Sequence, residues 1–143
     1  MVFMQARSPT SLAPAKPVDE KITINLGYVD LGQIDLLVQE GFYANRTDLI
    51  RTAIRSHLAA HAEVVKQVVA RKMLVLGIQH FSADSLRAVQ AAGESLQIRV
   101  LGLATIASDV SPELALAAID SVVVLGALHA SPAVKAALAG RIR

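Results

Sequence analysis

The chain has 143 residues, of which 53% are hydrophobic and 18% charged, so it can form one globular domain or two small ones and is too apolar to be a disordered tail. It has no cysteine, no apolar run long enough to span a bilayer and no secretory signal, which together favour a cytoplasmic protein without disulfides, thiolate chemistry or membrane contact. The formal charge of +2 comes from nine Lys/Arg against seven Asp/Glu in residues 1–73, an excess too small for non-specific nucleic-acid binding, although a dimer doubles it on one face.

The first 19 residues have no helical or strand periodicity. They contain Pro9, Pro14 and Pro17 among small and hydroxyl residues. This composition predicts a flexible N-terminal arm at 1–19. An alternative is an arm that follows DNA with Arg7 and Lys16.

Residues 21–26 alternate strictly between apolar and polar side chains. The apolar positions are Ile22, Ile24 and Leu26, and the polar positions are Lys21, Thr23 and Asn25. Period-two alternation predicts a half-buried strand. No hairpin turn follows, and a lone strand is not stable, so we expect a second copy of the chain to supply the antiparallel partner by two-fold symmetry.

Two short amphipathic helices are predicted after this strand. Asp30 and Gln33 have the spacing of a capping box that opens the first helix. Gly41 then ends it as a left-handed C-terminal cap. Asn45 and Asp48 form a second capping box, which opens a helix whose apolar face continues to residue 58.

The turn between these helices carries a specific motif. It reads Gly41-Phe42-Tyr43-Ala44-Asn45-Arg46-Thr47-Asp48-Leu49-Ile50-Arg51. Residues 20–58 therefore resemble the ribbon-helix-helix (CopG/Arc/MetJ-like) DNA-binding family, whose turn typically reads Gly-aromatic-x-Ser/Asn-Arg-Ser/Thr-Asp/Glu-x-Ile-Arg. The chain departs from the family in having Gly27-Tyr28-Val29 after the strand, where many members place Pro or an acidic residue.

The resemblance implies an intertwined dimer whose β-ribbon enters the major groove of double-stranded DNA. Such a ribbon fits that groove and places alternate side chains against base edges. The implied base contacts are Lys21, Thr23 and Asn25. The alternative is that these three side chains form only the solvated face of an edge strand.

The start of the second helix is the implied phosphate anchor. Asn45, Arg46 and Thr47 present free backbone amides at the positive end of the helix dipole. The alternative is that Asn45 and Asp48 only satisfy their own helix end, and both roles are compatible. Tyr28 could reach a phosphate or pack at the dimer seam.

The apolar spacing of the second helix continues beyond residue 58. We predict one long helix over 46–70, or two nearly collinear ones, with 59–72 as a helical extension that links 20–58 to the rest of the chain.

Residues 73–143 contain three repeats of about 24 residues. The sequence Val-Leu-Gly recurs with its glycine at 77, 102 and 126, and each copy is followed by a helical pattern that starts at Ser82, Ser111 or Ser131. A Ser cap, twice followed by Pro, starts a helix well. This half therefore predicts three strand–loop–helix repeats, with each glycine marking a bulge or close backbone approach near a strand end.

The predicted strands are apolar on both faces, as parallel strands covered by helices are. The repeats could form a short solenoid or a compact βαβαβα layer. The whole chain is thus predicted to be α+β: an N-terminal ribbon-helix-helix joined by a helix to a solenoid-like C-terminal α/β domain. Three strands leave two sheet edges, so 73–143 could also support a higher homo-oligomer.

No residue pattern predicts a cofactor, a metal or an enzyme. His57 and His61 have a spacing that can chelate a metal, but a nickel-responsive regulator of this superfamily would need further ligands, typically including Cys. No Ser/His/Asp set, Gly-rich phosphate loop or paired carboxylates are present.

The leading hypothesis is a sequence-specific DNA-binding transcriptional regulator. The alternative is an antitoxin-like or scaffold protein that uses the C-terminal repeats to bind a protein partner or to self-assemble. A ligand sensor with a pocket between the repeats is a third interpretation. A C-terminal half that is fully folded counts against the antitoxin version, because antitoxins of this fold usually carry disordered tails.

Overall fold

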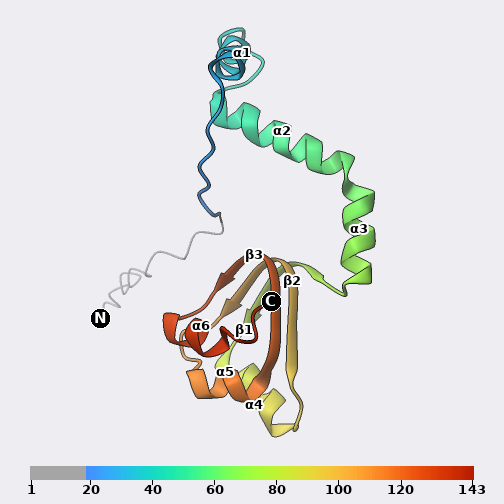
Figure 1. Ribbon diagram of the computed structural model, residues 1–143, viewed down its shortest axis with the longest axis vertical. Coiled ribbons are helices and arrows are strands. Elements are labelled where there is room, and N and C mark those ends of the chain that lie inside the picture. The colour runs from blue at the N-terminus through green and yellow to red at the C-terminus, as the bar shows by residue number, and fades with distance from the viewer. Residues whose placement is uncertain (1–18) are drawn as a thin grey trace, which may run out of the picture.

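The computed structural model of the protein describes residues 19–143, and the expected arm at 1–19, with Arg7 and Lys16, lies outside them except for its last residue. The elements are α1 (Tyr28–Gln39), α2 (Arg46–Ala60), α3 (Ala62–Arg71), β1 (Val75–Phe81), α4 (Ala83–Ala91), β2 (Leu96–Ile106), α5 (Pro112–Ala118), β3 (Ile119–His129) and α6 (Pro132–Leu138). The first three helices extend away from an α/β unit formed by β1 to α6 (Figure 1). Within 19–143, none of the helices has the length and apolarity needed to cross a membrane.

The α/β unit consists of three parallel strands, each followed by a helix. The strands lie in the order β1-β2-β3, and Gly77, Gly102 and Gly126 are in register across the sheet. The helices pack in sequence, α4 against α5 and α5 against α6. The repeats predicted for this half are therefore strand–helix units, as expected. The placement of the glycines near strand ends was wrong, because each strand continues for at least three residues beyond its glycine.

Serine caps start all three of these helices. The side-chain oxygens of Ser111 and Ser131 accept hydrogen bonds from the amides of Leu114 and Val134 at 3.1 and 3.2 Å. Ser82 forms a reciprocal capping box with Ser85. The prediction of Ser-initiated helices is confirmed at each position.

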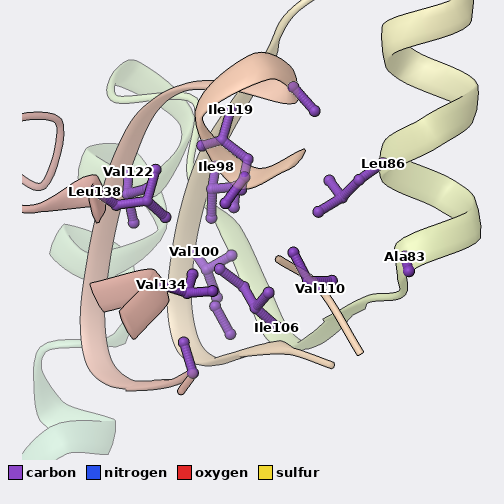
Figure 2. Close-up of a cluster of buried hydrophobic side chains, with 14 residues drawn as sticks. Ala83, Leu86, Ile98, Val100, Ile106, Val110, Ile119, Val122, Val134 and Leu138 are labelled. Carbon is purple, nitrogen blue, oxygen red and sulfur yellow. The ribbon is translucent and has the colours of Figure 1, made fainter. Parts of the chain in front are cut away.

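Among residues 19–143, the hydrophobic core lies within the α/β unit, between its sheet and helices (Figure 2). The largest side chains that it buries completely are Leu86, Ile98, Val100, Ile119, Val122, Val134 and Leu138. They are aliphatic, as a chain with 3% aromatic residues requires. Burying each such side chain stabilises the fold by about 1.5–3 kcal/mol.

Within the described residues, helices cover only one face of the sheet. On β2, buried Ile98, Val100 and Ala104 point to the helical side, and the alternate positions are more exposed. The opposite face, here called the outer face, carries Leu76, Ile78, Leu101, Leu103 and Leu125. Of these, Leu76, Ile78 and Leu125 are 67%, 69% and 51% exposed. A parallel sheet normally has both faces covered, so the apolar outer face is unfinished in a single chain.

The three glycines make the close strand approach that the repeat predicted. Their φ angles are 128°, 139° and 121°, a region that side-chain-bearing residues rarely adopt. A Cβ atom on Gly102 would lie 2.1 Å from the carbonyl oxygen of Gly77, and one on Gly126 would lie 2.1 Å from that of Gly102. Glycine is therefore required at 102 and 126 both by conformation and by space.

Residues 19–71 have no core of their own. No residue of α1, α2 or α3 is buried. Residues 21–26 form neither strand nor helix in the single chain, and Ile22 and Ile24 are 74% and 57% exposed. This amphipathic segment lacks the partner strand that its alternation requires.

The predicted capping box of Asp30 and Gln33 was wrong. The first helix begins at Tyr28 with Gly27 as its N-cap, and no side chain bonds that end. Asp30 lies instead in the first turn, where a carboxylate still favours the positive end of the helix dipole. The predicted stop at Gly41 is confirmed: its φ is 83°, and its amide and that of Phe42 bond back into the last turn.

The prediction for 46–70, one long helix or two nearly collinear ones, was also wrong. The helix is broken at His61, and α2 and α3 run in different directions (Figure 1). The His61 Nδ1 lies 3.1 Å from the carbonyl oxygen of His57, while the His61 amide donates to Leu58. In a continuous helix the His61 amide would donate to the His57 carbonyl, so its bond to the Leu58 carbonyl marks a tightened last turn in which α2 ends.

Candidate nucleic-acid interface

The three side chains expected to contact bases lie on one short segment. Lys21, Thr23 and Asn25 are all exposed and alternate with the apolar residues of the segment 21–26. Because side chains alternate along an extended segment, pairing that buries Ile22 and Ile24 leaves these three on the opposite face. A positive, an amide and a hydroxyl side chain on that face can donate to and accept from base edges.

The start of α2 is built as the sequence predicted, with one difference. The Asn45 side chain accepts a hydrogen bond from the Asp48 amide at 2.8 Å. The Asp48 carboxylate accepts in turn from the amide of Ala44, at 2.9 Å, one residue before the N-cap. Within the described residues, the amides of Arg46 and Thr47 have no hydrogen-bond partner in the protein. These are two of the four free donors at a helix start, where an anion is favoured.

Arg46 does not project freely towards solvent from this helix end. Its Nε and Nη2 donate to the two carboxylate oxygens of Asp35 at 2.7 and 2.8 Å, which ties α2 to α1. This hydrogen-bonded pair holds the pKa of the Asp35 carboxyl below its ordinary value of 3.8 and raises the pKa of the Arg46 guanidinium. Both side chains are about half exposed, so solvent and salt screen the pair.

Sequence reasoning did not find this ion pair. Asp35 lies 11 residues before Arg46 and on the other side of the turn, and no local spacing rule connects them. The signal was the turn at Gly41, which folds α2 back against α1 and brings the two residues together.

The remaining candidates lie where solvent reaches them. Tyr28, the first residue of α1, is 93% exposed. The rings of His57 and His61 are 4.9 Å apart and tilted against each other. Among residues 19–143, no group of three or more His, Cys, Asp or Glu side chains is placed to hold a metal ion.

Comparison with known families places this arrangement in a class. The model of the ribbon-helix-helix transcriptional regulator family matches residues 17–135. The chain therefore belongs to the ribbon-helix-helix transcriptional regulator family. The match extends well beyond the 20–58 segment that carries the motif and includes most of the strand–helix half. Neither the curated proteins nor the solved structures compared with the chain gave a significant match.

Proposed function

We propose that the protein is a cytoplasmic, sequence-specific DNA-binding transcriptional regulator that acts as an intertwined dimer. Two copies pair residues 21–26 as an antiparallel ribbon that enters the major groove. Lys21, Thr23 and Asn25 read base edges. The helix starts at Asn45, Arg46 and Thr47 hold the flanking phosphates.

The observation that carries this proposal is that residues 19–71 form no core of their own. Ile22, Ile24 and Leu26 are 74%, 57% and 40% exposed, and α1 to α3 bury no residue. Complete burial of an aliphatic side chain of this size stabilises a fold by about 1.5–3 kcal/mol, and each exposed side chain lacks a large part of that stabilisation. Pairing with a second copy buries them and leaves the polar positions together on the outside of the ribbon.

The ribbon is tested by alanine variants measured against a DNA site selected from random sequences with the parent protein. Lys21→Ala, Thr23→Ala and Asn25→Ala should each weaken binding to that site by about 1–3 kcal/mol, roughly 5- to 150-fold in Kd. Gln67→Ala, an exposed polar residue of α3, is the matched control and should bind like the parent. If all three ribbon variants bind as the parent does while remaining dimeric, the ribbon does not read the sequence.

The phosphate anchor is tested by the salt dependence of binding. Arg46→Ala should weaken binding to specific and unrelated DNA alike and lower the slope of log K against log salt by about 1. An unchanged slope would mean that Arg46 serves only its pair with Asp35. In contrast, Thr23→Ala should change specificity and leave the slope unchanged, because a hydroxyl releases no counterion.

A scaffold or self-assembly role for the C-terminal half is the second candidate. The α/β unit is fully folded and has its own core, which argues against a tail that folds on a toxin. Its apolar outer face and its open sheet edge favour association with another folded chain.

A further inference from the structure

The two edges of the sheet are not equivalent. The edge at β3 is covered in part by the end of the chain. There the backbone carbonyl of Arg141 accepts from the Val122 amide, and the backbone amide of Arg143 donates to the Val122 carbonyl, both at 2.9 Å. Within 19–143, β1 pairs with β2 alone, so its other edge has no strand beside it. Natural edge strands usually carry charges, proline or a bulge that block pairing. The β1 sequence Val75-Leu76-Gly77-Ile78-Gln79-His80-Phe81 contains neither a proline nor an Asp, Glu, Lys or Arg.

Gly77 supplies a second observation on the same edge. At 102 and 126, the space in front of the glycine holds the backbone carbonyl of the preceding strand. Gly77 has the same backbone conformation, with φ 128°, and the equivalent space in front of it is empty within 4 Å. The edge therefore has the close-approach site that the two inner strands use for a neighbouring backbone.

We infer that β1 pairs edge to edge with β1 of a second copy. The two three-stranded sheets then form one continuous sheet of six, with the two-fold axis near Gly77. A strand edge presents alternating backbone donors and acceptors, so its natural occupant is another strand. An antiparallel pair of identical strands is isologous, and each strand supplies what the other lacks.

The choice of a second copy as the occupant rests on the proposed ribbon dimer. That dimer tethers two α/β units through α2 and α3 and so raises their effective concentration for each other. Residues 21–26, the other unpaired strand-like segment among the described residues, are already used in the ribbon. Leu76 and Ile78 lie on the outer face of β1, 67% and 69% exposed, and gain cross-strand contacts in the joined sheet.

The test uses the absence of cysteine from the chain, which makes single-cysteine variants of the full-length protein specific reporters. Ile78→Cys reports the β1 edge. Leu125→Cys is the matched control, because it is an exposed aliphatic residue on the same face but on the opposite edge strand. In a joined sheet the two copies of residue 125 lie about five strand spacings apart, roughly 24 Å, beyond the reach of a short bismaleimide. Thr23→Cys reports the ribbon separately.

Each variant is treated with the bismaleimide at low protein concentration and run on a denaturing gel. A covalent dimer from Ile78→Cys, with none from Leu125→Cys, supports the edge pairing. Crosslinking of Thr23→Cys without Ile78→Cys would overturn the edge pairing and leave the ribbon dimer standing. Crosslinking of Ile78→Cys without Thr23→Cys would overturn the ribbon dimer and leave the edge pairing standing. A crosslink through Leu125→Cys would mean that the outer faces stack on each other, and it too would overturn the inference.

A second readout uses the double variant that combines Ile78→Lys with the reporter Leu76→Cys. The two lysines would lie near each other across the β1 pair, so their repulsion should abolish crosslinking through residue 76. The position is 69% exposed in the single chain, so the substitution should leave the α/β unit folded. Leu125→Lys is the control and should leave that crosslink unchanged. Equal crosslinking in the two double variants would contradict the edge pairing.

Discussion

Replacing Gly102 by alanine should destabilise the α/β unit more than almost any other single-methyl change. The new Cβ would lie 2.1 Å from the Gly77 carbonyl oxygen, and ordinary contact begins at 3.4 Å. To bring the new Cβ and the Gly77 oxygen to an ordinary van der Waals distance, β1 and β2 must separate by roughly 1.3 Å at this point. Such a shift is enough to break the nearest inter-strand hydrogen bonds, because their geometry weakens rapidly with distance.

The expected loss has two parts. Holding alanine at φ 139° costs about 1–3 kcal/mol in backbone strain. Each broken hydrogen bond adds about 0.5–1.5 kcal/mol. We therefore expect Gly102→Ala to lose about 3–5 kcal/mol of the free energy of unfolding, and Gly126→Ala to behave alike. That loss is a large part of the 5–15 kcal/mol that is typical of a folded domain.

Two companion variants separate strain from crowding. Gly77→Ala has the strained conformation without a clash in its own chain, so its loss within one α/β unit should be about 1–3 kcal/mol. A larger loss would report crowding against the paired copy. Gly140→Ala has neither, because its Cβ meets nothing within 4 Å, and should stay within about 0.5 kcal/mol of the parent. Chemical denaturation followed by circular dichroism suits a chain without tryptophan. If Gly102→Ala unfolds at the same denaturant concentration as Gly140→Ala, the close approach of the strands is wrong.

Three further predictions concern α1, α2 and the connection between α3 and the α/β unit. Met73, which is 77% exposed, has φ 54°, so Met73→Gly should relieve strain and raise the free energy of unfolding by up to about 1 kcal/mol in denaturant titrations. Asn45→Ala removes the N-cap of α2 and should cost about 1 kcal/mol by the same measurement, with a parent-like value refuting the cap. The pKa of Asp35 is lowered by Arg46, so the pair stabilises the fold fully above pH 3.8 and less as the pH falls through the lowered pKa. The melting temperature of Asp35→Asn should therefore lie below that of the parent near neutral pH and converge with it in strong acid; a constant difference would contradict this assignment.

What the sequence could predict was set by local chemistry. A serine cap, a Ser-Pro start and a left-handed glycine each act within one turn of chain, so the starts at 111 and 131 and the stop at Gly41 were predictable. The break at His61 was not, because the apolar spacing continues through that position and no Gly or Pro marks it. The ion pair of Asp35 with Arg46 needed the turn to be folded before it could be seen.

The alternating segment at 21–26 indicates a partner from the sequence alone, whereas the repeats indicate one only after the sheet is known. An alternating strand without a neighbour in its own sequence already indicates a second copy, since its unpaired backbone and apolar face lie within six consecutive residues. The open edge of β1 is visible only when the register of three strands is known, because Val-Leu-Gly reads the same at 77, 102 and 126. The difference between these glycines is what lies in front of them: a carbonyl at two of them and open space at the third. If both unpaired strands find partners in a second copy, the ribbon and the β1 pair constrain one dimer at its two ends. The bend at His61 then sets the distance between residues 21–26 and the joined sheets, so a change at one of these two contacts should alter the other.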